Sequence, residues 1–401
     1  MADRETGVLI VGAGPAGSRC AEVLRDEGFE GSVLLAGREP DPPYDRPPAS
    51  KQYLQGRTRR ADHFLYPDAF WVERDIELLT RTSVMKLDPA ARTATLSNKE
   101  EVRFGRALLA TGSNVRRLRV DGAALEGIHY LRALGNADAI RADAEGVDEV
   151  VLVGGSFIAC EVAASLTALG KRCSLVMLED RPLSAAFGAT AGEWFAGLLR
   201  ARGVEVHGGQ TVARFEGGDR VQRVICESGL TLAAGLVVMG TGAVPDTMLA
   251  RSAGLELGET GGVRCDAGLR TSAEVVWAAG DICEYDSVVH GRRLRVEHWE
   301  VARAQGAHAA RAMLGAPEPY TEVPYFWTDL ADWATAEYVG PAAAWDREVV
   351  RGSLEDGAFS ILYLHGARVV AALSVGRPAD LEEARELIAA GEKMDEASLS
   401  G

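Results

Sequence analysis

The sequence predicts an α/β fold with two Rossmann-like dinucleotide-binding domains, the second inserted in the first, followed by a C-terminal α+β domain. Two segments, residues 8–28 and 150–179, each read as an apolar strand, a glycine-rich turn and an apolar-periodic helix, which is the order of a nucleotide-binding βα unit. The chain has 401 residues, more than one hydrophobic core ordinarily supports. These observations together predict two dinucleotides, one of them a tightly held flavin and the other exchangeable.

The first unit carries the motif G-x-G-x-x-G directly after its strand, at Gly12, Gly14 and Gly17. The first glycine allows the tight turn, the second lets a pyrophosphate approach the backbone, and the third lets the helix pack on the strand. The amides at the start of the helix then face the phosphates. A plain loop is the alternative, but a second strand at residues 32–37 completes the βαβ order.

The second unit has a degraded version of this motif, with Gly154, then Ser156 where glycine is usual, and Ala159 at the third position. Alanine is tolerated there. We expect Ser156 to narrow the approach to the phosphates or to donate a hydrogen bond. Glu179 ends the second strand of the unit, where a carboxylate holds a ribose 2′-hydroxyl and repels a 2′-phosphate. The sequence therefore favours NADH over NADPH, although Arg181 lies close by.

Three further apolar strands, within residues 107–113, 236–247 and 271–285, end in small or glycine-containing turns. Each alone is an ordinary strand-to-turn junction. Their order along the chain is typical of a flavin domain that the chain leaves for an inserted nicotinamide domain and then re-enters. Asp281, after Gly280 in the last of them, is placed to meet the ribityl chain or phosphates of the flavin.

Composition excludes several other classes of protein. A formal net charge of −15 argues against nonspecific nucleic-acid binding. No apolar run approaches the ~20 residues that span a bilayer, and a first strand at about Val8 leaves no room for a signal peptide, so we expect a cytoplasmic protein. The six cysteines form no C-x-x-C or C-x4-C pair, which disfavours a metal site and a redox-active dithiol.

The chain resembles a known family in eight segments that span nearly its whole length: VGAGPAG, PYDRPPASK, LLATGS, VGGSFIACEVAASL, GTGAVPDT, WAAGDI, VEHWEVARAQG and VPYFWTDL. This family is the FAD-dependent, NAD(P)H-oxidising ferredoxin reductases of bacterial oxygenase systems, which share the glutathione reductase fold and are related to flavoproteins that resemble apoptosis-inducing factor. The resemblance implies an FAD domain at 1–112 and 246–320, an NADH domain at 113–245, and a C-terminal domain at 321–401.

The resemblance also implies two catalytic residues, Lys51 and Glu161. Lys51 would lie beside the flavin ring near N5, where a fixed ammonium stabilises the negative charge that accompanies reduction. Glu161, in the first turn of the second unit's helix, would pair with it. Without the resemblance, Lys51 reads as a solvated lysine after the cap-like Ser50, and Glu161 as a surface carboxylate.

The remaining candidates are cofactor-binding residues, and no metal ligands are expected. Trp299 and Trp327 are candidates to flank the flavin and nicotinamide rings, with ordinary core packing as the alternative. The family usually has an acidic residue at the position of Arg38, a role that falls here to Glu39 or is lost. The full predicted set is Gly12, Gly14, Pro15, Ala16, Gly17, Arg38, Glu39, Arg46, Pro47, Lys51, Val84, Ala110, Thr111, Gly112, Gly280, Asp281, Glu297, His298, Trp299, Trp327, Gly154, Gly155, Ser156, Phe157, Ile158, Glu161, Glu179 and Gly242.

The predicted function is an oxidoreductase that takes hydride from NADH onto flavin N5 and passes single electrons to a 2Fe–2S ferredoxin serving an oxygenase or P450. One alternative is an NADH oxidase or quinone reductase. Another is a slow flavoprotein that binds NADH and signals, as apoptosis-inducing factor does. Expected partners are ferredoxin and NADH, with no nucleic acid and no membrane, and a homodimer is left open.

Overall fold

The computed structural model describes residues 2–316, 318–341, 344–391 and 393, and the chain divides into two compact units. Unit 1 comprises Met1–Asp45, Phe64–Asn114 and Val244–Phe326, and unit 2 comprises Arg46–His63, Val115–Ala243 and Trp327–Gly401. Two short strands, β7 (Ser113–Val115) and β16 (Ala243–Pro245), contain the points where the chain leaves unit 1 for the nicotinamide-type fold and returns.

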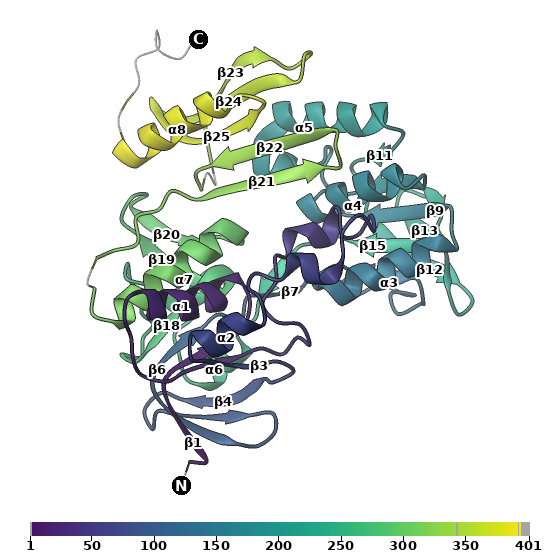
Figure 1. The fold of residues 1–401 in the computed structure, drawn as a ribbon. Helices are drawn as coiled ribbons and strands as arrows, with labels where there is room; N and C mark the ends of the chain where they lie inside the picture. Colours follow the sequence, from purple (N-terminus) through teal and green to yellow (C-terminus); the bar gives the residue numbers. More distant parts are fainter. Residues whose placement is uncertain (1, 317, 342–343, 392, 394–401) are drawn as a thin grey trace. The chain divides into compact units, whose positions relative to one another are not determined.

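Unit 1 is built on a seven-stranded sheet (Figure 1). Its central strand β1 is buried at Thr6 and from Val8 to Val11. Strands β2, β1, β6 and β18 run parallel, and β3 joins β2 in parallel; β4 and β5 extend the sheet as an antiparallel hairpin. The strands are β1 (Arg4–Val11), β2 (Val33–Ala36), β3 (Ile76–Leu79), β4 (Val84–Asp88), β5 (Thr93–Leu96), β6 (Glu101–Leu109) and β18 (Val276–Ala278).

The helices α1 (Pro15–Asp26) and α7 (Trp299–Met313) pack against each other in unit 1, because Gly306 of α7 lets the backbone of Ala16 approach closely. A small sheet of β17 (Val263–Cys265), β19 (Cys283–Ser287) and β20 (Arg292–Arg295) lies in the same unit. The remaining helices of unit 1 are α2 (Ala69–Glu73), α6 (Met248–Ser252) and the single turn η3 (Gly280–Ile282).

Unit 2 contains a second parallel sheet, in the order β11-β10-β9-β15-β8. Its strands are β8 (Ile128–Tyr130), β9 (Glu149–Val153), β10 (Arg172–Val176), β11 (Glu205–His207) and β15 (Leu236–Met239). Its helices are α3 (Leu134–Glu145), α4 (Phe157–Ala168) and α5 (Ser184–Ala201), with the single turns η1 (Pro47–Ser50) and η2 (Arg60–His63). An antiparallel sheet of β12 (Val212–Gly217), β13 (Val221–Cys226) and β14 (Thr231–Ala233) accompanies them.

The C-terminal part of unit 2 is a five-stranded sheet in the order β21-β22-β25-β24-β23, with α8 (Pro378–Ala390) packed against it (Figure 1). The strands are β21 (Tyr325–Leu330), β22 (Ala334–Val339), β23 (Arg347–Ser353), β24 (Ala358–His365) and β25 (Arg368–Val375). The buried Tyr363 hydroxyl donates to the Phe187 carbonyl of α5 at 2.7 Å, beside the kink at Gly188. This contact joins the sheet to the nicotinamide-type fold within unit 2.

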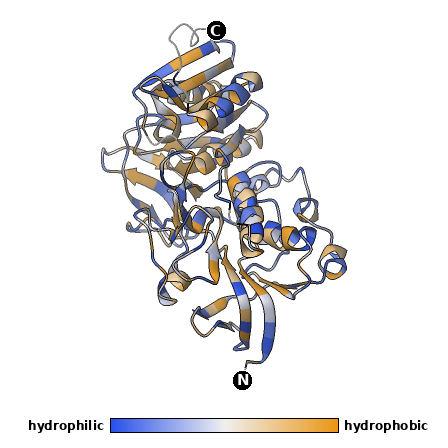
Figure 2. Ribbon diagram, turned by 90° about the vertical axis from the view of Figure 1, so that its left-hand side faces the viewer, coloured by the Kyte–Doolittle hydropathy of each residue, from blue (hydrophilic) through white to orange (hydrophobic). Residues whose placement is uncertain are grey.

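Hydropathy follows this layered arrangement. In Figure 2 hydrophobic positions run along the sheet strands, and most helices carry both colours, as expected for helices with one buried face. No helix in the described part of the chain is long and apolar enough to cross a bilayer.

The predicted mixed α/β architecture is confirmed, with two local corrections. Strand β10 ends at Val176, so Glu179 lies in the loop after the strand and does not end it. Helix α4 begins at Phe157 because the Ser156 side chain caps it, accepting from the Ala159 amide at 3.4 Å. Glu161 is therefore in the second helical turn and not in the first. Residues 394–401 of the predicted C-terminal domain lie outside the described residues.

Candidate functional site

The turn after β1 contains three glycines with two different roles. Gly12 and Gly17 allow close packing of the backbone, and Gly14 borders open space. An added Cβ on Gly12, which has φ +114°, would lie 2.1 Å from the Ala110 carbonyl oxygen, and one on Gly17 would lie 1.9 Å from the Gly12 oxygen. An added Cβ on Gly14 would meet nothing within 4 Å. Helix α1 starts with Pro15 and has no acidic residue in its first turn, so its free amides face an open space suited to an anion.

The strand ends around this turn are fixed by hydrogen bonds within unit 1. The Thr111 hydroxyl donates to the Asp246 carbonyl at 2.7 Å, and the Asp246 amide donates to the Gly112 carbonyl at 2.8 Å. Gly112, with φ +68°, occupies the left-handed region, where glycine is favoured. The predicted residues Ala110, Thr111 and Gly112 therefore form one rigid turn next to Gly12.

The turn η3 is tied down from two sides. The Gly280 amide donates to the Gln305 side-chain oxygen at 2.8 Å, and Arg295 donates to the Asp281 carbonyl at 3.1 Å. Gln305 is fully buried, and its amide nitrogen has no hydrogen-bond partner among the described residues. A buried donor of this kind ordinarily has a partner. The unpartnered amide and the open space at Gly14 both fit a bound dinucleotide phosphate with its ordered water.

Arg38 and Glu39 follow β2 and differ in what they contact. Arg38 donates to the Asp246 carboxylate at 2.9 Å and to the Asn114 side-chain oxygen at 2.8 Å. Glu39 accepts a hydrogen bond from the Tyr44 hydroxyl at 2.5 Å. Arg38 is thus turned to protein partners, and the role of Glu39 toward an adenosine ribose stays a prediction.

The segment leading into α7 holds three predicted residues. Arg295 forms an ion pair with Glu297, and the Arg303 guanidinium lies 4.9 Å from the centre of the Trp299 ring. The His298 ring stacks on Phe326 with ring centres 3.8 Å apart. Burial lowers the pKa of His298 to about 4, so this imidazole is neutral at pH 7 and does not act as a cation there.

Four other predicted residues occupy less specific positions. Val84 is the first residue of β4 and packs partly buried against the core of unit 1. Within unit 2, Arg46 precedes η1 and donates to the Arg132 carbonyl, while Pro47 is the first residue of η1. Trp327 is a partly exposed residue of β21.

The glycine turn of unit 2 repeats the construction of the first. Gly154 has φ +112°, and an added Cβ would lie 2.3 Å from the Gly240 carbonyl oxygen. The Ser156 hydroxyl donates to that same carbonyl at 2.8 Å, so it stabilises the turn, and its predicted effect on the phosphates stays a prediction. An added Cβ on Gly155 would lie 3.1 Å from a Glu179 carboxylate oxygen. The carboxylate therefore lies over the turn, as ribose recognition requires.

The other predicted residues of unit 2 near this turn have the following contacts. The Phe157 ring packs edge-on against Phe187 at 5.4 Å, and Ile158 is 37% exposed. Gly242 has φ +91° and an added Cβ would lie 3.9 Å from the Arg116 side chain. Arg181 forms an ion pair with Glu193 at 2.5 Å, so the cation nearest to Glu179 in sequence already has a carboxylate partner.

Lys51 and Glu161 form a buried ion pair at 2.8 Å, with side chains only 10% and 5% exposed. The pairing that the resemblance implies is present, and the solvated alternatives for both residues are wrong. Lys51 follows η1 directly and is buried there. Glu161 also accepts hydrogen bonds from the hydroxyls of Thr328, at 2.7 Å, and Ser50. Burial of two charges costs several kcal/mol unless they are paired and hydrogen-bonded, and here they are both.

The groups that hydrogen-bond to the predicted site residues were not predicted from the sequence. Ser50 was interpreted as a helix cap, although it borders Lys51, and Thr328 lies in the motif VPYFWTDL without having been assigned a role. Gln305 lies within the motif VEHWEVARAQG, and Arg295 directly precedes that motif. A small hydroxyl or amide next to a motif residue was the only available signal, and it does not identify the partner.

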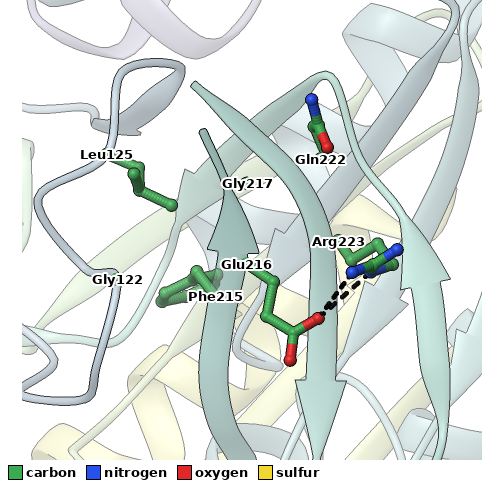
Figure 3. Close-up of a pocket in the computed structure, with 7 residues that line it drawn as sticks. All are labelled: Gly122, Leu125, Phe215, Glu216, Gly217, Gln222 and Arg223. Atoms are coloured by element: carbon green, nitrogen blue, oxygen red, sulfur yellow. Dashed lines mark hydrogen bonds and ion pairs between the residues drawn. The ribbon is translucent and has the colours of Figure 1, made fainter. Parts of the chain in front are cut away.

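A pocket of about 450 Å³ lies elsewhere in unit 2 (Figure 3). It is lined by Gly122, Leu125, Phe215, Glu216, Gly217, Gln222 and Arg223. Its polar rim is occupied by the ion pair of Arg223 with Glu216 at 2.8 Å. None of its lining residues is a predicted site residue, and we assign it no role in the chemistry.

All six cysteines are buried and free, and burial raises the pKa of the Cys20 and Cys160 thiols, which disfavours the reactive thiolate. Within the described ranges no group of His, Cys, Asp or Glu side chains is arranged to hold a metal ion.

The two glycine turns, the ribose carboxylate and the buried lysine pair define a flavoprotein oxidoreductase of the two-dinucleotide type. The pattern of the pyridine nucleotide-disulphide oxidoreductase family matches residues 6–306, and that of a reductase C-terminal domain matches residues 325–400. The chain belongs to this family. The predicted enzyme class, with FAD and NAD(P)H as cofactors, is confirmed.

The similar proteins are ferredoxin reductases. The chain is 35% identical to the 5,5′-dehydrodivanillate O-demethylase ferredoxin reductase subunit of Sphingobium sp., over 96% of this chain and 94% of that protein. A ferredoxin reductase for the CYP199A2 system of Rhodopseudomonas palustris matches with a TM-score of 0.95 and 31% identity, covering 98% and 97% of the two chains. The reductase in a covalent putidaredoxin reductase–putidaredoxin complex matches with a TM-score of 0.93 and 30% identity, over 100% and 96%. The resemblance inferred from the motifs is confirmed.

Proposed function

We propose that this protein takes hydride from NADH and passes electrons singly to a 2Fe–2S ferredoxin that serves an oxygenase or P450. FAD, when bound, accepts the two electrons together and returns them one at a time. The relatives are named as reductases of ferredoxins, and every cysteine of this chain is buried and free. Burial raises the pKa of the Cys20, Cys160 and Cys283 thiols, which disfavours a reactive dithiol, and a one-electron protein acceptor fits the site best.

The buried Lys51–Glu161 pair is the observation that carries the proposal. An enzyme that only binds FAD and NADH needs no buried ammonium, since burial of an ion pair adds little to stability. We propose that Lys51 stabilises the negative charge that accompanies flavin reduction, and that Glu161 neutralises Lys51 before that step. Fixed charge in a site that excludes water acts strongly on a developing charge.

NADH is the proposed donor, in preference to NADPH, because the Glu179 carboxylate lies over the Gly154–Gly155 turn. A carboxylate there accepts the ribose 2′-hydroxyl and repels a 2′-phosphate. We expect Glu179→Ala to lower the ratio of kcat/KM for NADH over NADPH by about tenfold, which is the size of a lost charged hydrogen bond. An unchanged ratio would show that the ribose assignment is wrong.

The remaining assignments are part of the same proposal. We propose the domain bounds 1–112 with 246–320 for FAD, 113–245 for NADH and 321–401 for the C-terminal domain, and a cytoplasmic location. The cofactor-binding role of each predicted glycine-turn residue is likewise proposed, on the conformations and close approaches described above.

Steady-state reduction of cytochrome c tests the proposal. With purified protein and NADH, we expect slow reduction alone and rapid reduction once a 2Fe–2S ferredoxin is added. Rapid NADH turnover with oxygen or quinone and no dependence on ferredoxin would instead identify an NADH oxidase or quinone reductase. Poor turnover with every acceptor, together with NADH-induced dimerisation, would identify the signalling alternative.

The role of Lys51 is tested separately by Lys51→Met, which keeps the length of the side chain and removes its charge. In anaerobic stopped-flow experiments we expect FAD to stay bound and its reduction by NADH to slow by tenfold or more. A reduction rate equal to that of the wild type would overturn the assignment of Lys51.

A further inference from the structure

The Glu161 carboxylate has more hydrogen-bond donors than its ion pair requires. One oxygen lies 2.8 Å from the Lys51 ammonium and accepts from the Thr328 hydroxyl at 2.7 Å, and the other accepts from the Ser50 hydroxyl. Thr328 is completely buried and Ser50 is 2% exposed. Each carboxylate oxygen therefore accepts a hydrogen bond from a hydroxyl, whereas only one of them contacts the ammonium.

These hydroxyls are held rigidly by the elements that carry them. Thr328 is an inward residue of β21, in which buried and partly exposed positions alternate. Ser50 ends η1, and its carbonyl accepts from the Ser165 hydroxyl of α4 at 2.7 Å. Ser165 in turn accepts from the Gln55 side-chain amide at 3.0 Å. Neither hydroxyl needs to rearrange to stay on Glu161.

A buried carboxylate that loses its only partner is strongly destabilised. If Lys51 were the sole donor, its withdrawal would leave the charge of Glu161 uncompensated, and the pair would resist separation. Hydrogen bonds to a charged group are worth about 1.5–3 kcal/mol each, so two hydroxyls offset much of that cost.

We infer that Thr328 and Ser50 are positioning residues, which keep the Glu161 carboxylate fixed and hydrogen-bonded while Lys51 withdraws from it during flavin reduction. The inference rests on the proposed role of Lys51 and involves no covalent change. Thr328 lies in the segment matched by the reductase C-terminal domain, so this domain contributes directly to the environment of the lysine pair.

Loss of the Thr328 hydroxyl should change the rate of flavin reduction and the stability of the reduced state, but not the binding of NADH. Without the Thr328 hydroxyl, the first carboxylate oxygen has only Lys51 as a donor, and Lys51 is held more tightly. Reduction should then be slower and the reduced state less favoured. The hydroxyl of Thr328 is used on Glu161 and its side chain is buried, so binding of NADH should be unaffected.

The test uses the FAD-bound variants Thr328→Val and Thr328→Ser. The matched control is Thr335→Val, because the Thr335 hydroxyl also donates to a carboxylate, that of Asp329 at 2.7 Å, but at an exposed position. For Thr328→Val we expect flavin reduction at saturating NADH to slow about tenfold, with the NADH dissociation constant unchanged. We expect the two-electron midpoint potential to fall by about 30 mV, the equivalent of a tenfold change in equilibrium. For Thr328→Ser and Thr335→Val we expect a rate of flavin reduction within about twofold of the wild type. A difference of that size is smaller than the loss of a hydrogen bond to a charged group would give.

Two results would overturn the inference: a Thr328→Val protein with wild-type rate and potential, or a Thr328→Ser protein as slow as Thr328→Val. The second result would mean that shape matters and the hydroxyl does not. If Thr328→Val does not fold, Ser50→Ala removes the donor of the other oxygen, and the same slowing and fall in potential are expected from it. A Lys51→Met protein with normal reduction would contradict the proposed function itself, whereas a slow Lys51→Met beside a normal Thr328→Val contradicts only this inference.

Discussion

Removal of the Glu161 carboxylate should destabilise the protein far more than removal of its lysine partner. Glu161→Ala leaves the Lys51 ammonium, which is 10% exposed, without a carboxylate, and it leaves the buried Thr328 hydroxyl without its acceptor, whereas the Ser50 hydroxyl keeps the Pro47 carbonyl at 3.2 Å. Breaking a buried ion pair from one side costs about 3–5 kcal/mol. Lys51→Met leaves a carboxylate that still accepts from two hydroxyls, so we expect a smaller loss of about 1–3 kcal/mol.

Thermal unfolding followed by calorimetry measures this difference. A loss of 1 kcal/mol lowers Tm by about 2–4 °C for a unit of 150–250 residues, so Glu161→Ala should lower Tm by about 10 °C and Lys51→Met by about half as much. The double variant Lys51→Met/Glu161→Leu replaces the pair with apolar groups, which is often near neutral. It should therefore be more stable than the sum of the single losses predicts. Strictly additive losses would refute the account of a coupled buried pair.

Three other predictions follow from the same structure. Gly14→Ala should fold normally but bind FAD at least tenfold more weakly in a fluorescence titration, whereas Gly12→Ala should lower Tm by several degrees because its Cβ would lie 2.1 Å from a carbonyl oxygen; equal behaviour of the two would contradict the assignment. Glu193→Ala should release Arg181 and raise kcat/KM for NADPH by about threefold, a small effect because exposed ion pairs are weak, and adding Arg181→Ala should remove that gain. Burial lowers the pKa of His298 from about 6.5 in the unfolded chain to about 4 in the folded protein. Its contribution to stability is therefore complete above pH 6.5 and is lost as the pH falls toward 4. The Tm of His298→Asn should fall less steeply than that of the wild type over this range, and parallel Tm profiles would contradict this prediction.

The fold and both glycine turns were predictable because they depend on residues close together in sequence. Gly12 and Gly154 each follow a run of buried apolar residues, and both have the positive φ and close carbonyl approach that the motif requires. The Glu179 carboxylate lies beside the Gly155 turn in spite of the error in the strand end, and its role toward the ribose stays a prediction. Its distance from Gly155 depends on the loop after β10, which no periodic pattern describes.

The surroundings of the lysine pair were not predictable from sequence periodicity. Lys51 and Glu161 are 110 residues apart, and only the family resemblance placed them together. Thr328 comes from a different sheet again, and a buried threonine in an alternating strand is ordinarily core. Its role became visible only when the structure placed its hydroxyl 2.7 Å from a buried carboxylate.

The central claim, that electrons pass from NADH through bound FAD to a one-electron acceptor, is tested most directly by an anaerobic titration of the purified protein. The account predicts that NADH bleaches the flavin absorbance and that oxidised 2Fe–2S ferredoxin then restores it, one electron per ferredoxin. A flavin that NADH does not bleach, or one that ferredoxin leaves reduced while oxygen or quinone restores its colour, would contradict the account.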